Sequence, residues 1–167
     1  ASLVKPNMLT YKSGQLSPAG RAYMNPGDTE VDCEYPGTKI YAQNATLGGT
    51  AEMFKCGGTE DVPMIKGLGN GAGTATFVVD IVGEGSHAIN IAFVTAESRD
   101  LSVTLNSEPT VQFTFVSSGE WCGNGGKSTV LPIEVNGFID GVNNITFGNS
   151  NKNEPIIEWF SIVDGST

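Results

Sequence analysis

Apolar and polar side chains alternate along much of the chain from residue 39 onward, as they do in half-buried β-strands. In the segment 74–82, for example, Phe77, Val79 and Ile81 fall on one face, and we expect that face to join a hydrophobic core. Gly, Asn and Pro separate the alternating segments and favour turns between them. The pattern predicts nine strands, at 39–45, 50–55, 74–82, 88–95, 101–105, 110–116, 131–135, 143–147 and 156–163.

Nine short strands without a convincing helix between them predict an all-β fold, in which two antiparallel sheets pack as a β-sandwich. We expect residues 37–167 to form this domain. Residues 1–36 are rich in Pro, Gly and polar side chains, and we interpret them as an irregular N-terminal extension or linker. Within them, Ser17 and Pro18 are typical of the start of a helical turn at 17–23.

The acidic composition of the chain argues against some classes of binding partner. The formal net charge of −9 and the pI of about 4.4 disfavour phosphate backbones and anionic lipids, so we expect neither nucleic acid nor membrane as a partner. The apolar stretches are far shorter than the roughly 20 residues that a membrane-spanning helix needs. The chain begins at Ala1 without Met or a signal-like segment, which is typical of a mature secreted chain or of a trimmed one.

Three cysteines are too few for a disulfide scaffold and lack metal-ligand spacing. Cys56 and Cys122 each lie in a Gly-rich segment, so a disulfide between these two loops is the first expectation. A bridge between Cys33 and Cys56 is the alternative. The only histidine, His87, lies in a Gly-Ser turn and is not expected to activate a catalytic thiol.

Catalysis is not expected either. A glycosidase needs two carboxylates that flank the scissile bond. Glu97, Asp100, Glu120 and Glu154 all lie in predicted loops, but none of them belongs to a motif that indicates this chemistry.

Four segments, in this order, carry a resemblance to a known family. They are YAQNATLGG at 41–49, GLGNGAG at 67–73, GVNNITF at 141–147 and PIIEWFSI at 155–162. Together they resemble carbohydrate-binding module family 35, which is related to family 6. The resemblance implies a galactose-binding-like β-jelly-roll sandwich, a structural calcium ion and a sugar site in the loops at one end. Members are usually attached to secreted glycoside hydrolases or polysaccharide lyases, and some related proteins are lectins.

Trp121 is the expected aromatic platform for the sugar. Sugar rings combine a C–H face with a rim of hydroxyls, so they are bound by an aromatic ring together with groups that donate and accept hydrogen bonds. Trp121 lies in a turn-forming segment and matches the loop aromatic of the family, although it also fits a role as a cover over the core. Trp159 lies within a predicted strand and is expected to be structural.

The expected hydrogen-bonding residues are Asn151, Asn153 and Arg99. The two asparagines precede the last strand, where the family carries a sugar-contacting Asn, but an ordinary polar turn explains them equally well. Arg99 matches a family loop whose Arg reaches an acidic sugar or its hydroxyls, and an ion pair with Asp100 or Glu97 is the alternative.

The resemblance also implies calcium ligands, namely Gln43, Glu158 and Glu52, with backbone carbonyls completing the shell. The match is partial, because the family usually offers two ligating side chains in the first strand and Tyr41 occupies the earlier position. Another departure is the loop before the third strand, where family members often place an aromatic residue and this chain has Lys66, Gly67 and Leu68.

These residues predict a non-catalytic module that binds a plant or microbial polysaccharide containing galactose or uronic acid. Such a module targets a tethered catalytic domain to its substrate. A stand-alone secreted lectin that uses the same calcium-supported site is the alternative.

Overall fold

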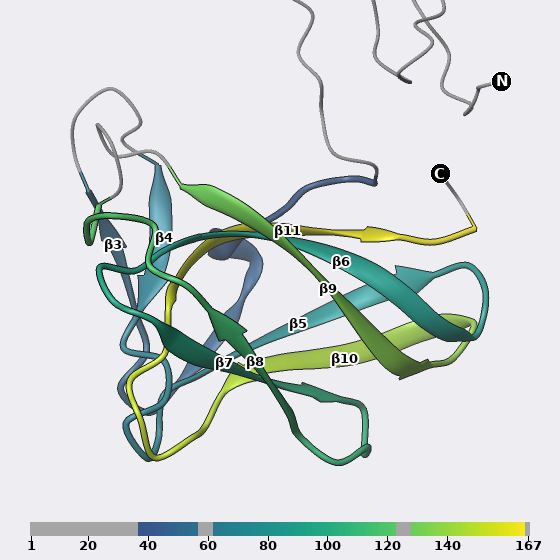
Figure 1. Cartoon of the computed structure of the whole chain (residues 1–167). Coiled ribbons are helices and arrows are strands. Elements are labelled where there is room, and N and C mark those ends of the chain that lie inside the picture. The colour runs from purple at the N-terminus through teal and green to yellow at the C-terminus, as the bar shows by residue number, and fades with distance from the viewer. Residues whose placement is uncertain (1–36, 57–61, 123–127, 166–167) are drawn as a thin grey trace, which may run out of the picture. The chain divides into compact units, whose positions relative to one another are not determined.

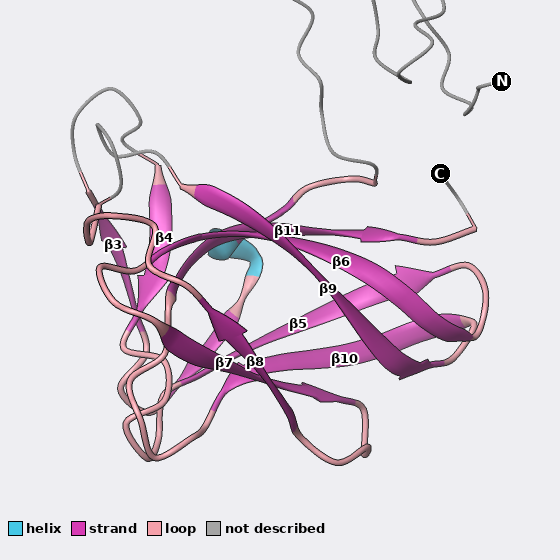
Figure 2. Cartoon of the chain, viewed as in Figure 1, coloured by secondary structure: helices cyan, strands magenta, loops and turns pink. Residues whose placement is uncertain are grey.

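The computed structural model describes residues 37–56, 62–122 and 128–165, which form eleven strands and one 3-10 turn (Figures 1 and 2). The elements are β1 (Ile40–Tyr41), η2 (Ala42–Asn44), β2 (Thr46–Gly48), β3 (Glu52–Lys55), β4 (Pro63–Lys66), β5 (Thr74–Ile81), β6 (Gly85–Val94), β7 (Arg99–Leu105), β8 (Val111–Phe115), β9 (Thr129–Phe138), β10 (Gly141–Gly148) and β11 (Ile156–Val163).

The strands form two sheets, which lie as separate layers in Figure 1. The first sheet has the order β3-β4-β11-β6-β9, with β1 also paired to β11. The second sheet has the order β2-β5-β10-β7-β8. Every strand pair is antiparallel. The predicted all-β sandwich of two antiparallel sheets is therefore confirmed.

The segment 39–45 is not the single strand that its pattern predicts. β1 ends at Tyr41, and the N–H of Ala45 donates to the carbonyl of Ala42 (3.0 Å), which closes the turn η2. The chain changes sheets at this turn, because β1 pairs with β11 in the first sheet whereas β2 pairs with β5 in the second. Figure 2 shows η2 in cyan. The alternation of apolar and polar residues does not reveal this change of sheet, since β1 and β2 are both extended.

The sequence pattern did not predict strand β4, for a different reason. It is short and begins with Pro63, and its two central residues are both fully buried. Ile65 packs in the main core, while Met64 packs in a second cluster with Val94 and Ile156. Because both faces of β4 are covered, its apolar and polar residues do not alternate.

Three aromatic rings join the two sheets at the centre of the core. Phe77 of β5 and Phe147 of β10 come from the second sheet, and Phe160 of β11 comes from the first. The ring centroids lie 4.8 Å apart for Phe77–Phe160 and 5.2 Å apart for Phe147–Phe160, in edge-to-face geometry. Such aromatic pairs add stabilisation beyond the area they bury. The core-facing prediction for Phe77, Val79 and Ile81 is confirmed, since all three are buried.

His87 lies within β6 rather than in the predicted turn, and its contacts are structural. Its ring nitrogens lie 3.0 Å from the carbonyl oxygen of Val163 and 2.6 Å from that of Gly83. The ring also packs edge-to-face against Phe138. These contacts fasten the turn between β5 and β6 to the end of β11.

Some sequence predictions lie outside the described residues. They are the irregular extension at 1–36, the helical turn at 17–23 and the role of Cys33. Among the residues that are described, no helix is long and apolar enough to cross a membrane.

Replacing Phe160 by Ala should lower the free energy of unfolding by about 3–5 kcal/mol, because it removes the ring that both sheets share and leaves a cavity. Val116→Ala is the control, since Val116 is 60% exposed and its loss should cost less than about 0.5 kcal/mol. Urea unfolding of both variants measures the difference. Equal stabilities would contradict this description of the core.

Candidate functional site

Two loops from distant parts of the sequence run side by side at one end of the sandwich (Figure 1, lower left). They are residues 67–73 and 149–154. The N–H of Asn70 donates to the carbonyl of Lys152 (2.9 Å), and Gly69 approaches the same carbonyl so closely that a Cβ there would lie 2.0 Å from its oxygen. Gly69 also has a positive φ of 79°, which favours glycine. The Gly-rich motif therefore allows the two loops to pair.

A buried carboxylate fixes the second loop to the sheet. Glu154 is 2% exposed, and its Oε1 accepts a hydrogen bond from the backbone N–H of Ser102 in β7 (2.7 Å). Its Oε2 accepts one from the N–H of Ser150 within the loop (3.2 Å). Buried carboxylates are stable only when their oxygens are satisfied in this way. Glu154 thus holds the loop that carries Asn151 and Asn153.

Arg99, at the start of β7, lies beside this loop. Its guanidinium carbon is 4.1 Å from the centroid of the Trp121 ring, which is the geometry of a cation–π contact. The same guanidinium donates to the carboxylate of Glu97 from Nε (3.1 Å) and from Nη2 (3.0 Å). A longer bond from Nη1 reaches the backbone carbonyl of Glu154 (3.4 Å). Arg99 therefore links the indole to the loop that Glu154 holds.

The expected disulfide between Cys56 and Cys122 is present. It connects the end of β3 with the segment that follows β8, and it lies next to Trp121 in the sequence. The bridge limits how far the indole can move from Arg99. Trp121 is 39% exposed, as expected for a side chain in a surface turn.

An open cavity of about 430 Å³ lies between these elements. Each residue that lines it has a polar or charged side chain, and together they combine amides, hydroxyls and charges of both signs. The lining residues are Asn70, Glu97, Ser98, Arg99, Asp100, Thr114, Asn151, Lys152 and Asn153.

The structure brings three of the four predicted sugar-binding residues to this cavity, namely Arg99, Asn151 and Asn153. Trp121 does not line it, but its ring contacts Arg99, which does. Asn151 and Asn153 are exposed, so their amides are accessible to a ligand. Whether these residues bind sugar stays a prediction.

Sequence reasoning missed several lining residues. Asn70 belongs to the Gly-rich motif, and Glu97, Ser98 and Asp100 flank Arg99, so the recognised segments already contained them. Thr114 gave no signal of its own. It reaches the cavity because β8 pairs with β7 in a register that places it opposite Asp100, and register is a long-range property.

Of the four carboxylates that the sequence predicts in loops, three are engaged or buried, and Asp100 lies in β7 rather than in a loop. Glu97 is engaged with Arg99, Asp100 accepts a hydrogen bond from the hydroxyl of Thr114 (2.8 Å), and Glu154 is buried. The arrangement around Arg99 is thus one of binding groups that already hold one another in place.

The expected calcium ligands lie on three different elements. Glu158 lies in β11 and accepts a hydrogen bond from Ser128 (2.6 Å), while Gln43 lies in η2. Glu52 lies in β3, which β4 separates from β11. Within the described ranges, no group of three or more His, Cys, Asp or Glu side chains is placed to hold a metal ion. As placed, these donors fall short of the six to eight oxygens that calcium takes, so calcium stays a prediction of the resemblance.

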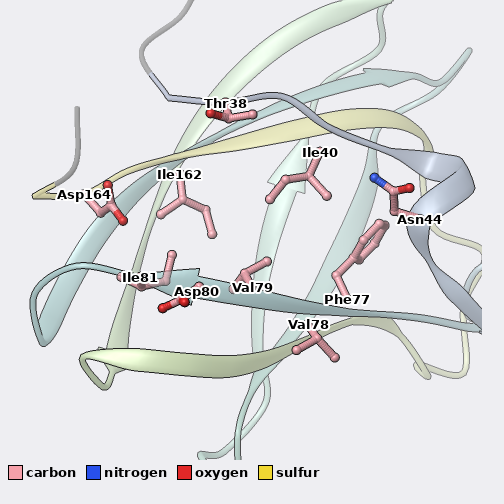
Figure 3. Close-up of a pocket in the computed structure, with 10 residues that line it drawn as sticks. All are labelled: Thr38, Ile40, Asn44, Phe77, Val78, Val79, Asp80, Ile81, Ile162 and Asp164. Carbon is pink, nitrogen blue, oxygen red and sulfur yellow. The ribbon is translucent and has the colours of Figure 1, made fainter.

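A second cavity, of about 390 Å³, lies between β5 and the strands β1 and β11 (Figure 3). Its walls include the core residues Phe77, Val79, Ile81 and Ile162, together with Ile40. Phe77 is only 2% exposed and offers no accessible ring face. Its lining also includes the polar residues Thr38, Asn44, Asp80 and Asp164, but none of the residues that line it is cationic or offers an accessible aromatic ring.

Solved structures share the fold of this chain, although no family model and no curated protein sequence matches its sequence. A family 35 carbohydrate-binding module from Clostridium thermocellum aligns with a TM-score of 0.63 and 20% identity over 75% of this chain and 97% of that one. The family 35 module from Paenibacillus barcinonensis aligns with a TM-score of 0.61 and 16% identity over 75% and 98%, respectively. The chain therefore has the β-sandwich fold of these modules, and the resemblance found in the sequence is confirmed at the level of the fold.

An enzyme structure contains a similar region. The exo-β-1,3-galactanase from Phanerochaete chrysosporium, solved with galactose, aligns with a TM-score of 0.64 and 25% identity over 77% of this chain. The match covers 29% of that enzyme, so this chain corresponds to less than a third of its length.

Replacing Glu154 by Ala should lower the free energy of unfolding by about 2–5 kcal/mol, because it leaves the buried N–H of Ser102 and the partly buried N–H of Ser150 without acceptors. Glu154→Gln should cost less, since one acceptor oxygen remains. Glu97→Ala is the control, because the side chain of Glu97 is 65% exposed and its ion pair should contribute less than about 1 kcal/mol.

Urea unfolding, together with amide hydrogen exchange at Ser102, measures these effects. Exchange at Ser102 should accelerate in Glu154→Ala and stay unchanged in Glu97→Ala. If both variants matched the original chain in stability and exchange, Glu154 would not hold the loop.

Proposed function

We propose that this chain is a non-catalytic carbohydrate-binding module that binds a polysaccharide containing galactose or uronic acid. The observation that carries the proposal is the polar cavity in which Arg99, Asn151 and Asn153 converge. Amide groups supply donors and an acceptor together, which matches neighbouring sugar hydroxyls. The fold shared with family 35 modules supports the same function.

In this proposal the two asparagines and Arg99 bind the hydroxyls of the sugar, and Trp121 contributes an apolar surface beside them. One face of the indole is already covered by the guanidinium of Arg99. The sugar therefore packs against the exposed part of the ring, and the guanidinium orients it. Because Arg99 is held by Glu97 and by the carbonyl of Glu154, little side-chain freedom is lost on binding.

Galactose is the first sugar to test. The similar enzyme from P. chrysosporium is an exo-β-1,3-galactanase that was solved with galactose. Uronic acids are the second, because Arg99 and Lys152 both line the cavity and offer cationic groups. Glu97 and Asp100 also line the cavity and balance these two cationic groups, so a neutral sugar meets no net charge there.

We further propose that the module is secreted and targets an attached glycoside hydrolase or lyase to its polysaccharide. The disulfide between Cys56 and Cys122 supports an oxidising compartment. The partial match to a longer enzyme supports attachment to a catalytic domain. A module of this kind raises the local concentration of the tethered enzyme on its substrate.

Replacing Trp121 by Ala should weaken glycan binding by about thirty-fold or more, which corresponds to the roughly 2 kcal/mol of a binding hot spot. Isothermal titration calorimetry with ligands chosen on a glycan array measures the effect. Tyr41→Ala is a matched control, because Tyr41 is also aromatic and is 40% exposed against 39% for Trp121, yet it lies on β1.

The control should bind as the original chain does, and both variants should keep the melting temperature within a few degrees. Unchanged affinity in Trp121→Ala, or an equal loss in Tyr41→Ala, would contradict the proposed site.

A further inference from the structure

Four threonines occupy matching positions on four neighbouring strands of the second sheet. Thr46 of β2 lies opposite Thr76 of β5, Thr76 lies opposite Thr146 of β10, and Thr146 lies opposite Thr104 of β7. We call these four residues the threonine row. Directly paired residues point to the same face of a sheet, and neighbouring strands lie about 4.8 Å apart, so the row extends for about 14 Å.

The threonine row faces away from the core. In each of the three longer strands, the residues on either side of the threonine are buried between the sheets. These flanking residues are Ala75, Phe77, Ile145, Phe147, Val103 and Leu105. Since successive side chains alternate between faces, the threonines lie on the outer face of the second sheet.

The hydroxyls of this face keep hydrogen-bonding capacity. Thr76 and Thr146 contact each other through their hydroxyls (3.0 Å), and so do Thr104 and Thr110 (2.6 Å). Each pair uses one of its two protons, so one O–H and several lone pairs remain for a ligand. None of these residues is charged. The face therefore offers donors and acceptors in a flat array, which is the chemistry that binds sugar hydroxyls.

The threonine row is continuous with the polar cavity. Thr114 of β8 lines the cavity and lies opposite Asp100 of β7. Two residues before Thr114 in β8, Gln112 lies opposite Ser102 of β7 and donates a hydrogen bond to the hydroxyl of Ser102 (3.2 Å). Gln112 and Thr114 therefore share the outer face with Thr104. From Asp100 to Thr104 the strand advances about 13 Å.

Two exposed valines extend this face beyond the row. Val78 and Val142 are 70% and 60% exposed, and their strand partners are Asn144 and Asp80, respectively. Figure 3 shows Val78 on the opposite side of β5 from Val79 and Ile40, which face the gap between the sheets. The outer face of the second sheet thus combines hydroxyls with small apolar surfaces. A glycan chain likewise combines hydroxyls with apolar C–H surfaces.

We propose that a glycan chain held in the polar cavity continues over Thr114 and Gln112 onto the threonine row, so that the module binds several consecutive sugars rather than one. This inference rests on the proposed function. The occupant is the same glycan, because the face is continuous with the cavity and carries the same kinds of polar group.

The test measures affinity against chain length. The probes are β-1,3-galacto-oligosaccharides and galacturonic acid oligomers of one to four units, titrated into the full chain by calorimetry. In the series that binds, affinity should rise at least tenfold from one unit to four. The double variant Thr76→Val and Thr146→Val should lose most of this rise while its affinity for the single sugar stays unchanged.

Valine keeps the shape and the strand preference of threonine and removes only the hydroxyl. Thr129→Val is the matched control, because Thr129 is an exposed threonine of β9 in the first sheet. It should bind all probes as the original chain does, and light scattering should find the same molecular mass for all three proteins.

Each other result overturns the inference in a recognisable way. Affinity for one unit without a rise toward four, or a rise that the double variant keeps, removes the extended face and leaves the proposed function standing. Failure of every probe to bind removes both. A change in molecular mass of the double variant without a change in affinity assigns the face to contacts between copies of the chain instead.

Discussion

The two hydrogen bonds that the carboxylate of Glu154 accepts are the constraint on which the candidate site depends. One reaches the backbone of Ser102 in β7, and the other reaches the backbone of Ser150 in the loop. A buried carboxylate without these donors would be costly, so the loop and the sheet hold each other in one arrangement. The candidate site is therefore anchored to β7, an inner strand of the second sheet, although most of the residues that line it come from loops.

The remaining contacts extend this constraint outward. Arg99 is the first residue of β7, the strand that contains Ser102. It connects the loop at 149–154 to the ring of Trp121. Its ion pair with Glu97 is exposed on one side and contributes little to stability. The ion pair instead helps to orient Arg99, because a guanidinium that lies over an indole has a fixed plane. The disulfide at Cys122 restrains the indole from the other direction. Under the proposed function, such preorganisation would lower the entropic cost of binding a flexible glycan.

The sequence predicted the fold well wherever one face of a strand is buried and the other is solvated. β5 follows its predicted boundaries closely for that reason, since the period of two persists along its length. The prediction failed at two places. β4 is covered on both faces, and the segment 39–45 changes sheets at η2, which depends on the partners of β1 and β2 rather than on local pattern.

The sequence likewise predicted part of the candidate site. Asn151, Asn153 and Arg99 came from a resemblance, and the structure places them together. Thr114 and the threonine row were not predictable, because they depend on strand register, which pairs residues far apart in the sequence. Glu154 stood out only as one loop carboxylate among several. Its burial follows from the pairing of two loops, and no local pattern encodes that pairing.

The central claim is that a glycan binds at the polar cavity beside Arg99. The most direct measurement is a titration of the isotope-labelled chain with β-1,3-galactotriose and with a galacturonic acid trimer, followed by two-dimensional NMR. For the glycan that binds, this account predicts shifts in the side-chain amides of Asn151 and Asn153, in Nε of Arg99 and in the indole N–H of Trp121. Shifts confined to the cavity between β5 and β11, with these four signals unchanged, would contradict it.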